Sequence, residues 1–238
     1  MRDYSNYHSV SANDKMLYDG KELFKKSLSS LEGHDVLING VEKRAVIQSK
    51  FLNHLRGDIK TIMTEMDELS MGDIITHNGD NWLTIFLTDD YIAYLKGAMQ
   101  RCNEKLRWIN HNGESIEVDC VISKSPLDRI FLKSTSHDIP IVDGFVYIVC
   151  PLNEFTSTIQ HKQRFIMGSQ VYEITGVDDV TNVIKEKGVI QFIARYGISK
   201  SSDNVENKIA DNSHLYGQNS VPPEDGEPSS GNNGGGWW

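Results

Sequence analysis

The clearest structural signal in the chain is the segment Asp73-Ile74-Ile75-Thr76-His77-Asn78-Gly79-Asp80-Asn81-Trp82-Leu83-Thr84-Ile85-Phe86. Two short runs of branched and aromatic side chains flank an Asn-Gly pair, and both residues of such a pair accept the positive φ angles of a tight hairpin turn. The segment therefore predicts two antiparallel strands joined by a turn at 77–80.

Two more segments repeat this pattern on either side of the first. Residues 35–48 are interrupted by Asn39-Gly40, and residues 106–120 by Asn112-Gly113. Further strand-like runs follow at 145–150, 164–167, 171–175 and 189–196. Short strands separated by Asn-Gly turns are typical of all-β folds, so we expect a mainly β protein built as a small barrel or sandwich.

An internal likeness bears on the number of units. Residues 71–90 and 165–179 each contain a strand, a Gly turn, an aromatic residue that starts the next strand (Trp82, Tyr172) and a closing acidic pair (Asp89-Asp90, Asp178-Asp179). Duplication would produce two related β units, whereas two unrelated hairpins can look alike by chance. We expect an arm with a helix at 1–34, β units at 35–122 and 123–202, and a tail at 203–238.

Helices are less strongly indicated than strands. One helical face is formed by Leu17, Phe24, Leu28 and Leu31. Asn13 or Asp14 would cap the start of this helix, and Gly33 would end it. Residues 52–66 also have helical spacing, but Gly57 interrupts it and 59–64 fits a strand equally well. One or two short helices packed on β structure are expected.

The C-terminal region differs in composition from the rest. From Asp203 onward the chain has six acids and one base, and residues 217–236 are rich in Gly, Pro, Ser and Asn. Such a segment buries too little apolar area to offset its conformational entropy, which predicts a flexible tail. It ends in Trp237-Trp238, which is either an unselected end or an aromatic anchor that docks on another subunit.

Composition excludes several classes of protein. The 238 residues carry a net charge of −9 without a basic stripe, which argues against a sequence-specific DNA binder. No apolar run is long enough for a transmembrane helix, and the N-terminus lacks the apolar region of a secretory signal. The three cysteines form no C-x-x-C pair, as suits a reducing compartment.

A search for catalytic patterns gives no positive evidence. The sequence has no nucleophile elbow, zinc-protease motif or phosphate-binding loop, and its eight histidines never lie within four residues of one another. Asp89-Asp90 and Asp178-Asp179 could act as metal ligands or as a carboxylate dyad, but each follows a strand, where Asp commonly caps a turn. Trp82, Trp108 and Tyr172 are expected in the core. We expect no catalytic residue, no metal, no cofactor and no enzymatic activity.

Several segments resemble structural proteins of the head–tail connector of tailed bacteriophages. In the first half these are Ile38–Gln48, Met71–Ile75 with Trp82-Leu83, Tyr94–Asn103 and Leu106–Trp108. In the second half they are Gln163–Ile166, Val171–Asp179 and Asp203–Asp211. The resemblance spans 35–211 and rests on structural spacings rather than on a catalytic signature.

The resemblance implies a β-barrel subunit of head-closure, stopper or collar type in the virion. Such proteins form rings of six or twelve copies that bind a portal or adaptor protein on one side and tail proteins on the other. Genomic DNA passes through the ring without sequence-specific binding, and no membrane is involved. The net negative charge agrees with a channel along which phosphates slide.

Two other functions remain open at this point. A β-rich surface module that binds a glycan or a host receptor would need Trp82 or Trp108 exposed on a shared face. An enzyme such as a nuclease would need Asp89 and Asp90 to converge with a base or a metal ion in a cleft.

Overall fold

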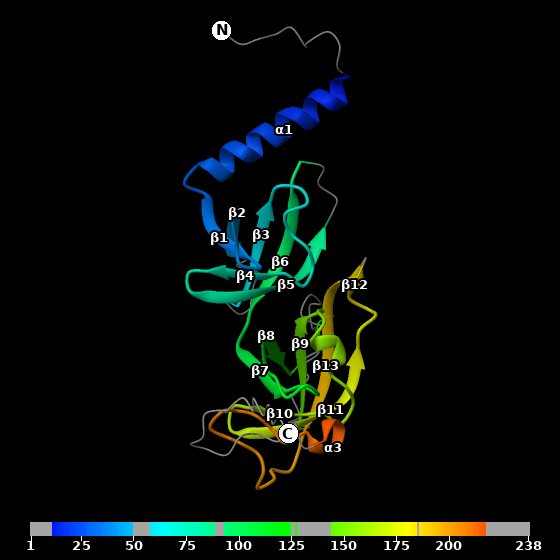
Figure 1. Cartoon of the computed structure of the whole chain (residues 1–238). Coiled ribbons are helices and arrows are strands. Elements are labelled where there is room, and N and C mark those ends of the chain that lie inside the picture. Colours follow the sequence, from blue (N-terminus) through cyan, green and yellow to red (C-terminus); the bar gives the residue numbers. More distant parts are fainter. Residues whose placement is uncertain are drawn as a thin grey trace, which may run out of the picture. The chain divides into compact units, whose positions relative to one another are not determined.

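A computed structural model of the chain describes residues 11–49, 58–88, 93–124, 127, 144–184 and 186–217 (Figure 1). The expected mainly β fold is confirmed, since most described elements are strands. The chain divides into two compact units. One contains Met1–Asn103 with Val149–Ser157 and Asp179–Ile190, and the other contains Glu104–Ile148 with Thr158–Asp178 and Gln191–Trp238.

The expected N-terminal helix is present as α1 (Ala12–Ser29). The hydroxyl of Ser11 accepts the Asp14 N–H, so the cap is Ser11 rather than Asn13 or Asp14. Phe24 and Leu28 are buried against Val46, but Leu31 lies beyond the helix and is fully exposed. In the described residues no helix has the length and hydrophobicity needed to cross a bilayer.

The first sheet is a closed barrel of antiparallel strands in the order β1-β2-β3-β6-β5-β4. Its strands are β1 (Gly33–Ile38), β2 (Val41–Ser49), β3 (Ile59–Thr64), β4 (Ile74–His77), β5 (Asp80–Thr88) and β6 (Leu95–Arg101). The hairpins at Asn39-Gly40 and Asn78-Gly79 are confirmed, and all four turn residues have positive φ angles. Residues 59–64 form a strand rather than part of a helix, and Gly33 begins β1 instead of ending α1.

The interior of this barrel is apolar. Its core consists of Val36, Ile38, Ala45, Ile62, Leu69, Ile75, Trp82 and Met99. Successive side chains of a strand point to opposite faces, so the barrel interior takes every second residue of each strand. This alternation determines which polar residues near the strand ends also point inward.

The second sheet has the order β10-β11-β13-β9-β8-β7, and β12 pairs with β13. Its strands are β7 (Glu104–Ile109), β8 (Ser115–Ser123), β9 (Phe145–Pro151), β10 (Arg164–Met167), β11 (Gln170–Asp178), β12 (Val183–Ile184) and β13 (Lys187–Tyr196). β7 also contacts β10, which makes the sheet barrel-like. The remaining described elements are a 3-10 turn, η1 (Thr156–Thr158), and a short helix, α3 (Ser213–Tyr216).

The two sheets have the same topology. When β7, β8, β9, β10, β11 and β13 are matched in turn to β1–β6, the strand orders agree. Ile75 faces Trp82 across the β4–β5 hairpin, and Phe165 faces Tyr172 across β10–β11. A register shift follows Thr84 in one sheet and Ile174, two residues after Tyr172, in the other. The likeness between 71–90 and 165–179 therefore reflects two related β units.

The limits of the units differ from those expected at 122 and 203. The hairpin of β7 and β8, which pairs residues 104–109 with 115–120, belongs to the second sheet. The segment 203–212 packs into the second unit, where Ala210 is fully buried with Ile166 and Val171. A continuous run of hairpins gives no sign of where one sheet ends, and the acidic composition of 203–211 hides the adjacent apolar residues Ile209 and Ala210.

Candidate functional site

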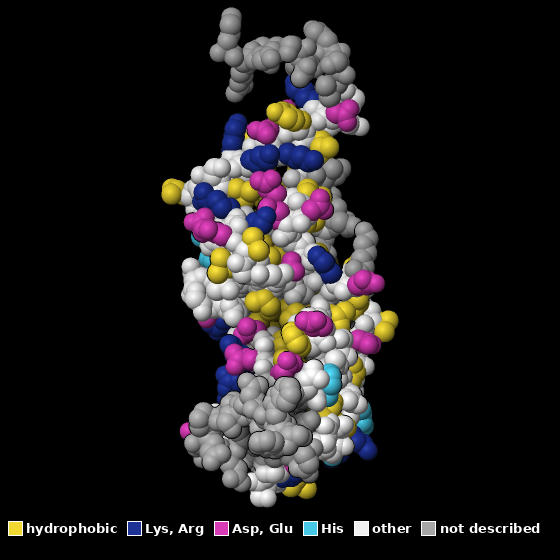
Figure 2. All heavy atoms as spheres, in the orientation of Figure 1, with side chains coloured by type: hydrophobic (Ala, Val, Ile, Leu, Met, Phe, Trp, Pro, Cys, Tyr) yellow, Lys and Arg dark blue, Asp and Glu magenta, His cyan; other side chains and the backbone are white. Residues whose placement is uncertain are grey.

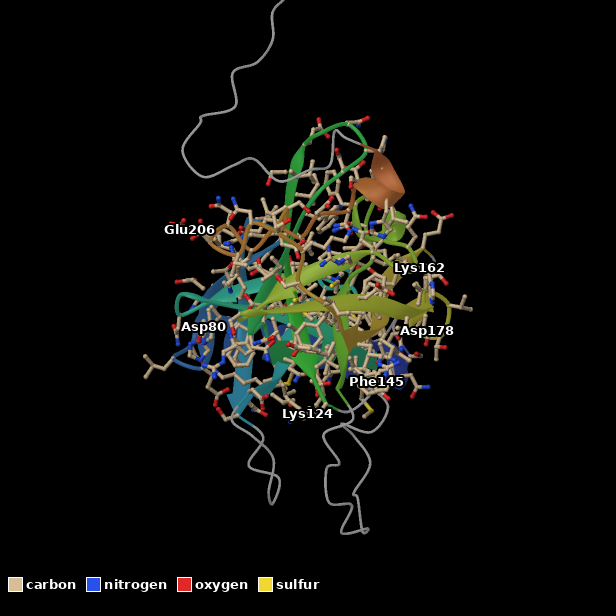
Figure 3. All side chains as sticks on the ribbon, turned by 90° about the horizontal axis from the view of Figure 1, so that it is seen from below. Asp80, Lys124, Phe145, Lys162, Asp178 and Glu206 are labelled. Atoms are coloured by element: carbon tan, nitrogen blue, oxygen red, sulfur yellow. The ribbon has the colours of Figure 1, made fainter. Side chains whose placement is uncertain are left out.

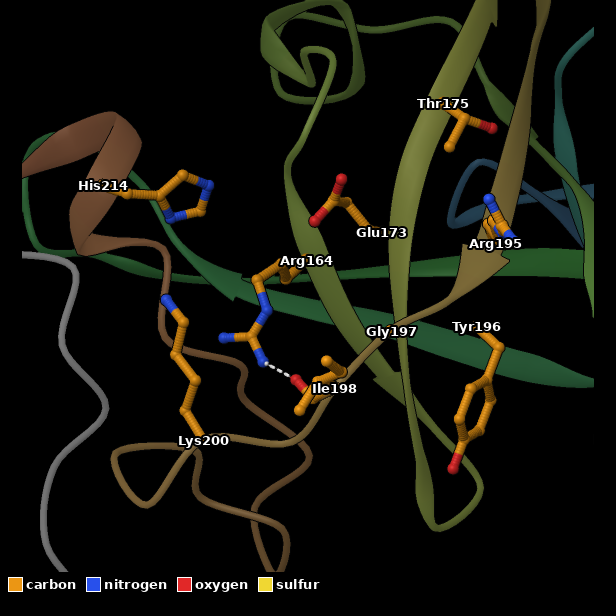
Figure 4. Close-up of a pocket in the computed structure, with 9 residues that line it drawn as sticks. All are labelled: Arg164, Glu173, Thr175, Arg195, Tyr196, Gly197, Ile198, Lys200 and His214. Carbon is orange, nitrogen blue, oxygen red and sulfur yellow. Dashed lines mark hydrogen bonds between the residues drawn. The ribbon is translucent and has the colours of Figure 1, made fainter.

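A surface cavity of about 700 Å³ lies on the second unit (Figure 4). Strands β10, β11 and β13 provide part of its wall, and the segment that follows β13 provides the rest. Its lining residues are Arg164, Glu173, Thr175, Arg195, Tyr196, Gly197, Ile198, Lys200 and His214. Most of these side chains are polar or charged, but their apolar atoms also contribute to the lining, so the cavity surface is mixed in character.

Arg164 forms the base of the cavity and joins β10 to the C-terminal segment. Its guanidinium donates to both carboxylate oxygens of Asp203, at 2.9 and 2.8 Å. It also donates to the carbonyl oxygens of Asp211 and Ile198, at 3.0 and 2.7 Å. The side chains of Arg164 and Asp203 are both almost completely buried. Because all these hydrogen bonds stay inside the unit, Arg164 orients the cavity wall rather than a ligand.

Asn212 also attaches the C-terminal segment to β10. Its side-chain amide makes the two backbone hydrogen bonds that a neighbouring strand would otherwise make. Its side-chain oxygen accepts the Arg164 N–H at 2.7 Å, and its side-chain nitrogen donates to the Arg164 carbonyl at 3.0 Å. These two bonds satisfy backbone groups on the outer side of β10. A buried, fully bonded amide and the ion pair together hold residues 203–212 in one position.

The two acids of this attachment are held in their charged form. Burial would raise the pKa of Asp203, but hydrogen bonds from Arg164 and from the Lys200 and Asp211 N–H groups keep it below its usual value. Burial likewise opposes ionisation of Asp211, but bonds from Ser202 and Ser213 and the charge of Lys200 lower its pKa to about 2. The attachment is therefore fully charged at neutral pH.

The other basic residues that line the cavity also have partners. Arg195 lies over the ring of Phe145 at 5.6 Å and faces Glu173 in the sheet register. Lys200 is 3.7 Å from the Asp211 carboxylate, and His214 Nε2 is 3.0 Å from the Lys162 carbonyl. Figure 3 shows Phe145 and Lys162 at the periphery of the unit. Such a surface can exchange hydrogen bonds with a protein partner.

The aromatic residues singled out in the sequence do not form an exposed platform. Trp82 and Trp108 are 2% and 1% exposed, in the first barrel and the second sheet respectively. Trp108 packs edge-on against Phe165, and Tyr172 is half-buried edge-on against Tyr196. The glycan or receptor module would need Trp82 or Trp108 at the surface, so this alternative loses the feature on which it depended.

The acidic pairs give no metal site in the residues that can be examined. Asp178 is the last residue of β11, opposite Gln191, and Asp179 is exposed just after it. Within the described ranges no three His, Cys, Asp or Glu residues are placed to hold a metal ion. Asp89 and Asp90, like Trp237 and Trp238, lie outside the described residues.

The residues that organise the cavity were not found by sequence patterns. Arg164 and Asp203 are 39 positions apart, and no local spacing links them. The one available signal is the apolar pair Ile209-Ala210 among the acids, which is unusual for a solvated tail. It would have indicated a packed segment but not its partner.

Comparisons with known proteins agree with the division into two units. Residues 6–101 match the family of YomX N-terminal domains, and residues 104–195 match the family of YomX C-terminal domains. The chain is 25% identical over 226 residues to the SPbeta prophage-derived protein YomX of Bacillus subtilis strain 168, with 85% of this chain and 100% of the relative covered. No solved structure matches the chain. The chain is thus similar to a phage-derived protein along most of its length.

Proposed function

We propose that the chain is a structural protein of a phage particle, placed in the head–tail connector. On this proposal it forms a ring of six or twelve copies between a portal or adaptor protein and the tail proteins, and catalyses no reaction. The prophage origin of the relative supports a phage context. The sequence resemblance described above supports the connector.

The observation that carries the assembly role is the surface of α1. Phe24 and Leu28 are buried against the first barrel, and Phe24 stacks on Tyr94 at 4.9 Å. Met16 and Leu23, two helical turns apart and on one face, are 74% and 65% exposed. A helix with more apolar surface than its own barrel covers is suited to contact with another subunit.

The architecture of the units also favours assembly through side chains and extensions. The first sheet is a closed barrel, so it offers no free edge for strand addition by a neighbour. The second unit holds residues 203–212 tightly through Arg164 and Asn212. The tail after Gly217 therefore starts from a firmly held position, as a connecting arm requires.

The charge pattern is compatible with passage of DNA. On the face in Figure 2, Lys and Arg side chains lie among Asp and Glu, and neither sign forms a continuous patch. The net charge of −9 favours repulsion of the phosphates of passing DNA over their retention. We therefore propose that genomic DNA passes the ring without sequence-specific contacts.

The test of the assembly role is the mass of the full-length protein in native mass spectrometry, together with its presence in purified particles. We expect a ring of six or twelve 26.9 kDa subunits. The double variant Met16→Asp, Leu23→Asp should weaken association at least tenfold and leave the far-UV circular dichroism spectrum unchanged. The matched control Asp19→Ser, Lys25→Ser alters exposed positions of the same helix. A monomer at all concentrations, or a protein absent from particles, would overturn the proposal.

A further inference from the structure

One end of the first barrel carries polar side chains that point inward. His34, Lys60 and His77 each lie two residues from a core residue of their own strand, on β1, β3 and β4. Strand alternation therefore places them on the inward face of their strands, on the same side as Trp82 of β5, where His77 is buried, Lys60 is half-buried and His34 is exposed. We call these four residues the barrel mouth.

The contacts within the barrel mouth are close. The rings of His34 and His77 are 5.2 Å apart, and Lys60 Nζ lies 4.5 Å from the centre of the Trp82 ring. At the rim, Arg101 is 3.7 Å from Asp80, which is labelled in Figure 3. The mouth thus combines a lysine, two imidazoles and an indole, with one arginine–aspartate pair beside them.

Two of these groups are buried without a hydrogen-bond partner. His77 and Trp82 are 5% and 2% exposed, yet His77 Nδ1 and Trp82 Nε1 make no hydrogen bond. Buried polar atoms are nearly always satisfied in folded proteins, so the Trp82 N–H indicates a missing acceptor and His77 Nδ1 indicates a missing hydrogen-bond partner. With Lys60 beside them, the ligand best suited to the site is a carboxylate.

The second barrel shows how its own equivalent position is filled. When β7 is matched to β1, the buried residues Leu106 and Trp108 take the inward positions of Val36 and Ile38, and Glu104 then takes the position of His34. Glu104 accepts a hydrogen bond from Lys208 Nζ at 2.8 Å, and Lys208 belongs to the C-terminal segment. An acidic position in the second barrel therefore receives a basic side chain from the extension of the same chain. The first barrel carries a basic residue type, His34, at the matching place.

We propose that the barrel mouth of one copy binds the acidic segment Glu224-Asp225-Gly226-Glu227 of a second copy. Residues 218–238 contain three acids within four positions and no base, so this segment is complementary to the mouth. The inference rests on the proposed self-assembly and names the contact through which the tail takes part in it. The carboxylates of this segment accept hydrogen bonds from Lys60, His77 and Trp82.

The experiment uses the indole N–H signal of Trp82 in the ¹⁵N-labelled full-length chain with the substitutions Glu224→Gln, Asp225→Asn and Glu227→Gln, because the neutral tail leaves the mouth free for an added peptide; the signal is assigned by comparison with Trp82→Phe in the same background. A synthetic peptide of residues 218–230 is the probe, and the same peptide with Gln at 224 and 227 and Asn at 225 is its control. We expect a saturable shift of the Trp82 signal with the acidic peptide, and a dissociation constant at least tenfold weaker with the neutral one.

Placing an acid in the mouth separates this contact from a general effect of charge. His34→Glu should weaken peptide binding at least tenfold, whereas Lys25→Glu, the same sign of change at an exposed position of α1, should not. An unchanged thermal transition in His34→Glu shows that the barrel remains folded. A peptide that carries Lys at 224, 225 and 227 should bind His34→Glu better than the wild type.

The outcomes distinguish this contact from the ring itself. The contact is overturned if the acidic peptide causes no shift of the Trp82 signal, even where the oligomer is intact. It is also overturned if inorganic phosphate by itself shifts that signal, since any anion would then suffice. A shift that Lys25→Glu abolishes as strongly as His34→Glu also overturns it. Specific peptide binding by a protein that stays monomeric supports the contact and counts against the ring.

Discussion

Asp211 fastens the C-terminal segment through bonds that require its carboxylate to be ionised. Its two oxygens accept from the Ser202 hydroxyl at 2.6 Å and from the Ser213 N–H at 2.8 Å. Burial opposes the charge, but these bonds and Lys200 lower the pKa of Asp211 from 3.8 to about 2. The unfolded chain therefore takes up a proton at a higher pH than the folded one.

The expected result is a loss of stability in acid. The contribution of Asp211, about 2 kcal/mol, is complete above the unfolded pKa and disappears as the pH falls through the folded value near 2. Urea unfolding at several pH values should give Asp211→Asn a lower free energy of unfolding at pH 6, with the difference shrinking toward pH 2. The exposed Asp179→Asn variant should follow the wild type throughout. A difference that does not depend on pH would contradict this account.

At the scale of the element, the two related hairpins make a matched pair. In the β4–β5 turn both Asn78 and Gly79 have positive φ angles, whereas in the β10–β11 turn Gly168 does and Ser169 does not. An L-residue with a side chain is strained at positive φ, so Gly79→Ala should cost about 1 kcal/mol of unfolding free energy. Ser169→Ala, at the equivalent second position, should change stability by less than about 0.5 kcal/mol. Equal effects in chemical denaturation would show that the turns are not distinguished by backbone angle.

The same elements explain what the sequence could predict. Asn-Gly turns and alternating strands are local signals, which is why the hairpins at 39–40 and 78–79 could be assigned. The choice between strand and helix at 59–64 could not be made from the sequence, because pairing with β2 and β6 decides it. The site was harder still: Arg164 meets Asp203 only after β10, β11 and β13 have brought distant residues together. The place of His34 beside His77 likewise depends on closure of the first barrel.

At the scale of the whole molecule, the described fold and the tail should be separable in function. Ala210 and Asn212 are fully buried, whereas the segment after Gly217 contains Val221 as its one aliphatic residue. Deleting residues 218–238 should therefore leave the midpoint of thermal unfolding within about 2 °C of the full chain, since no buried apolar residue or ion pair of the two described units is removed. The same deletion should reduce the oligomer in sedimentation velocity and the incorporation of the protein into particles. Deletion from residue 203 instead removes Asp203 and leaves the buried Arg164 charge unpaired, which should cost about 3–5 kcal/mol. If deleting residues 218–238 unfolds the two described units, or if the yield of particles stays the same, the tail is not a separate assembly arm.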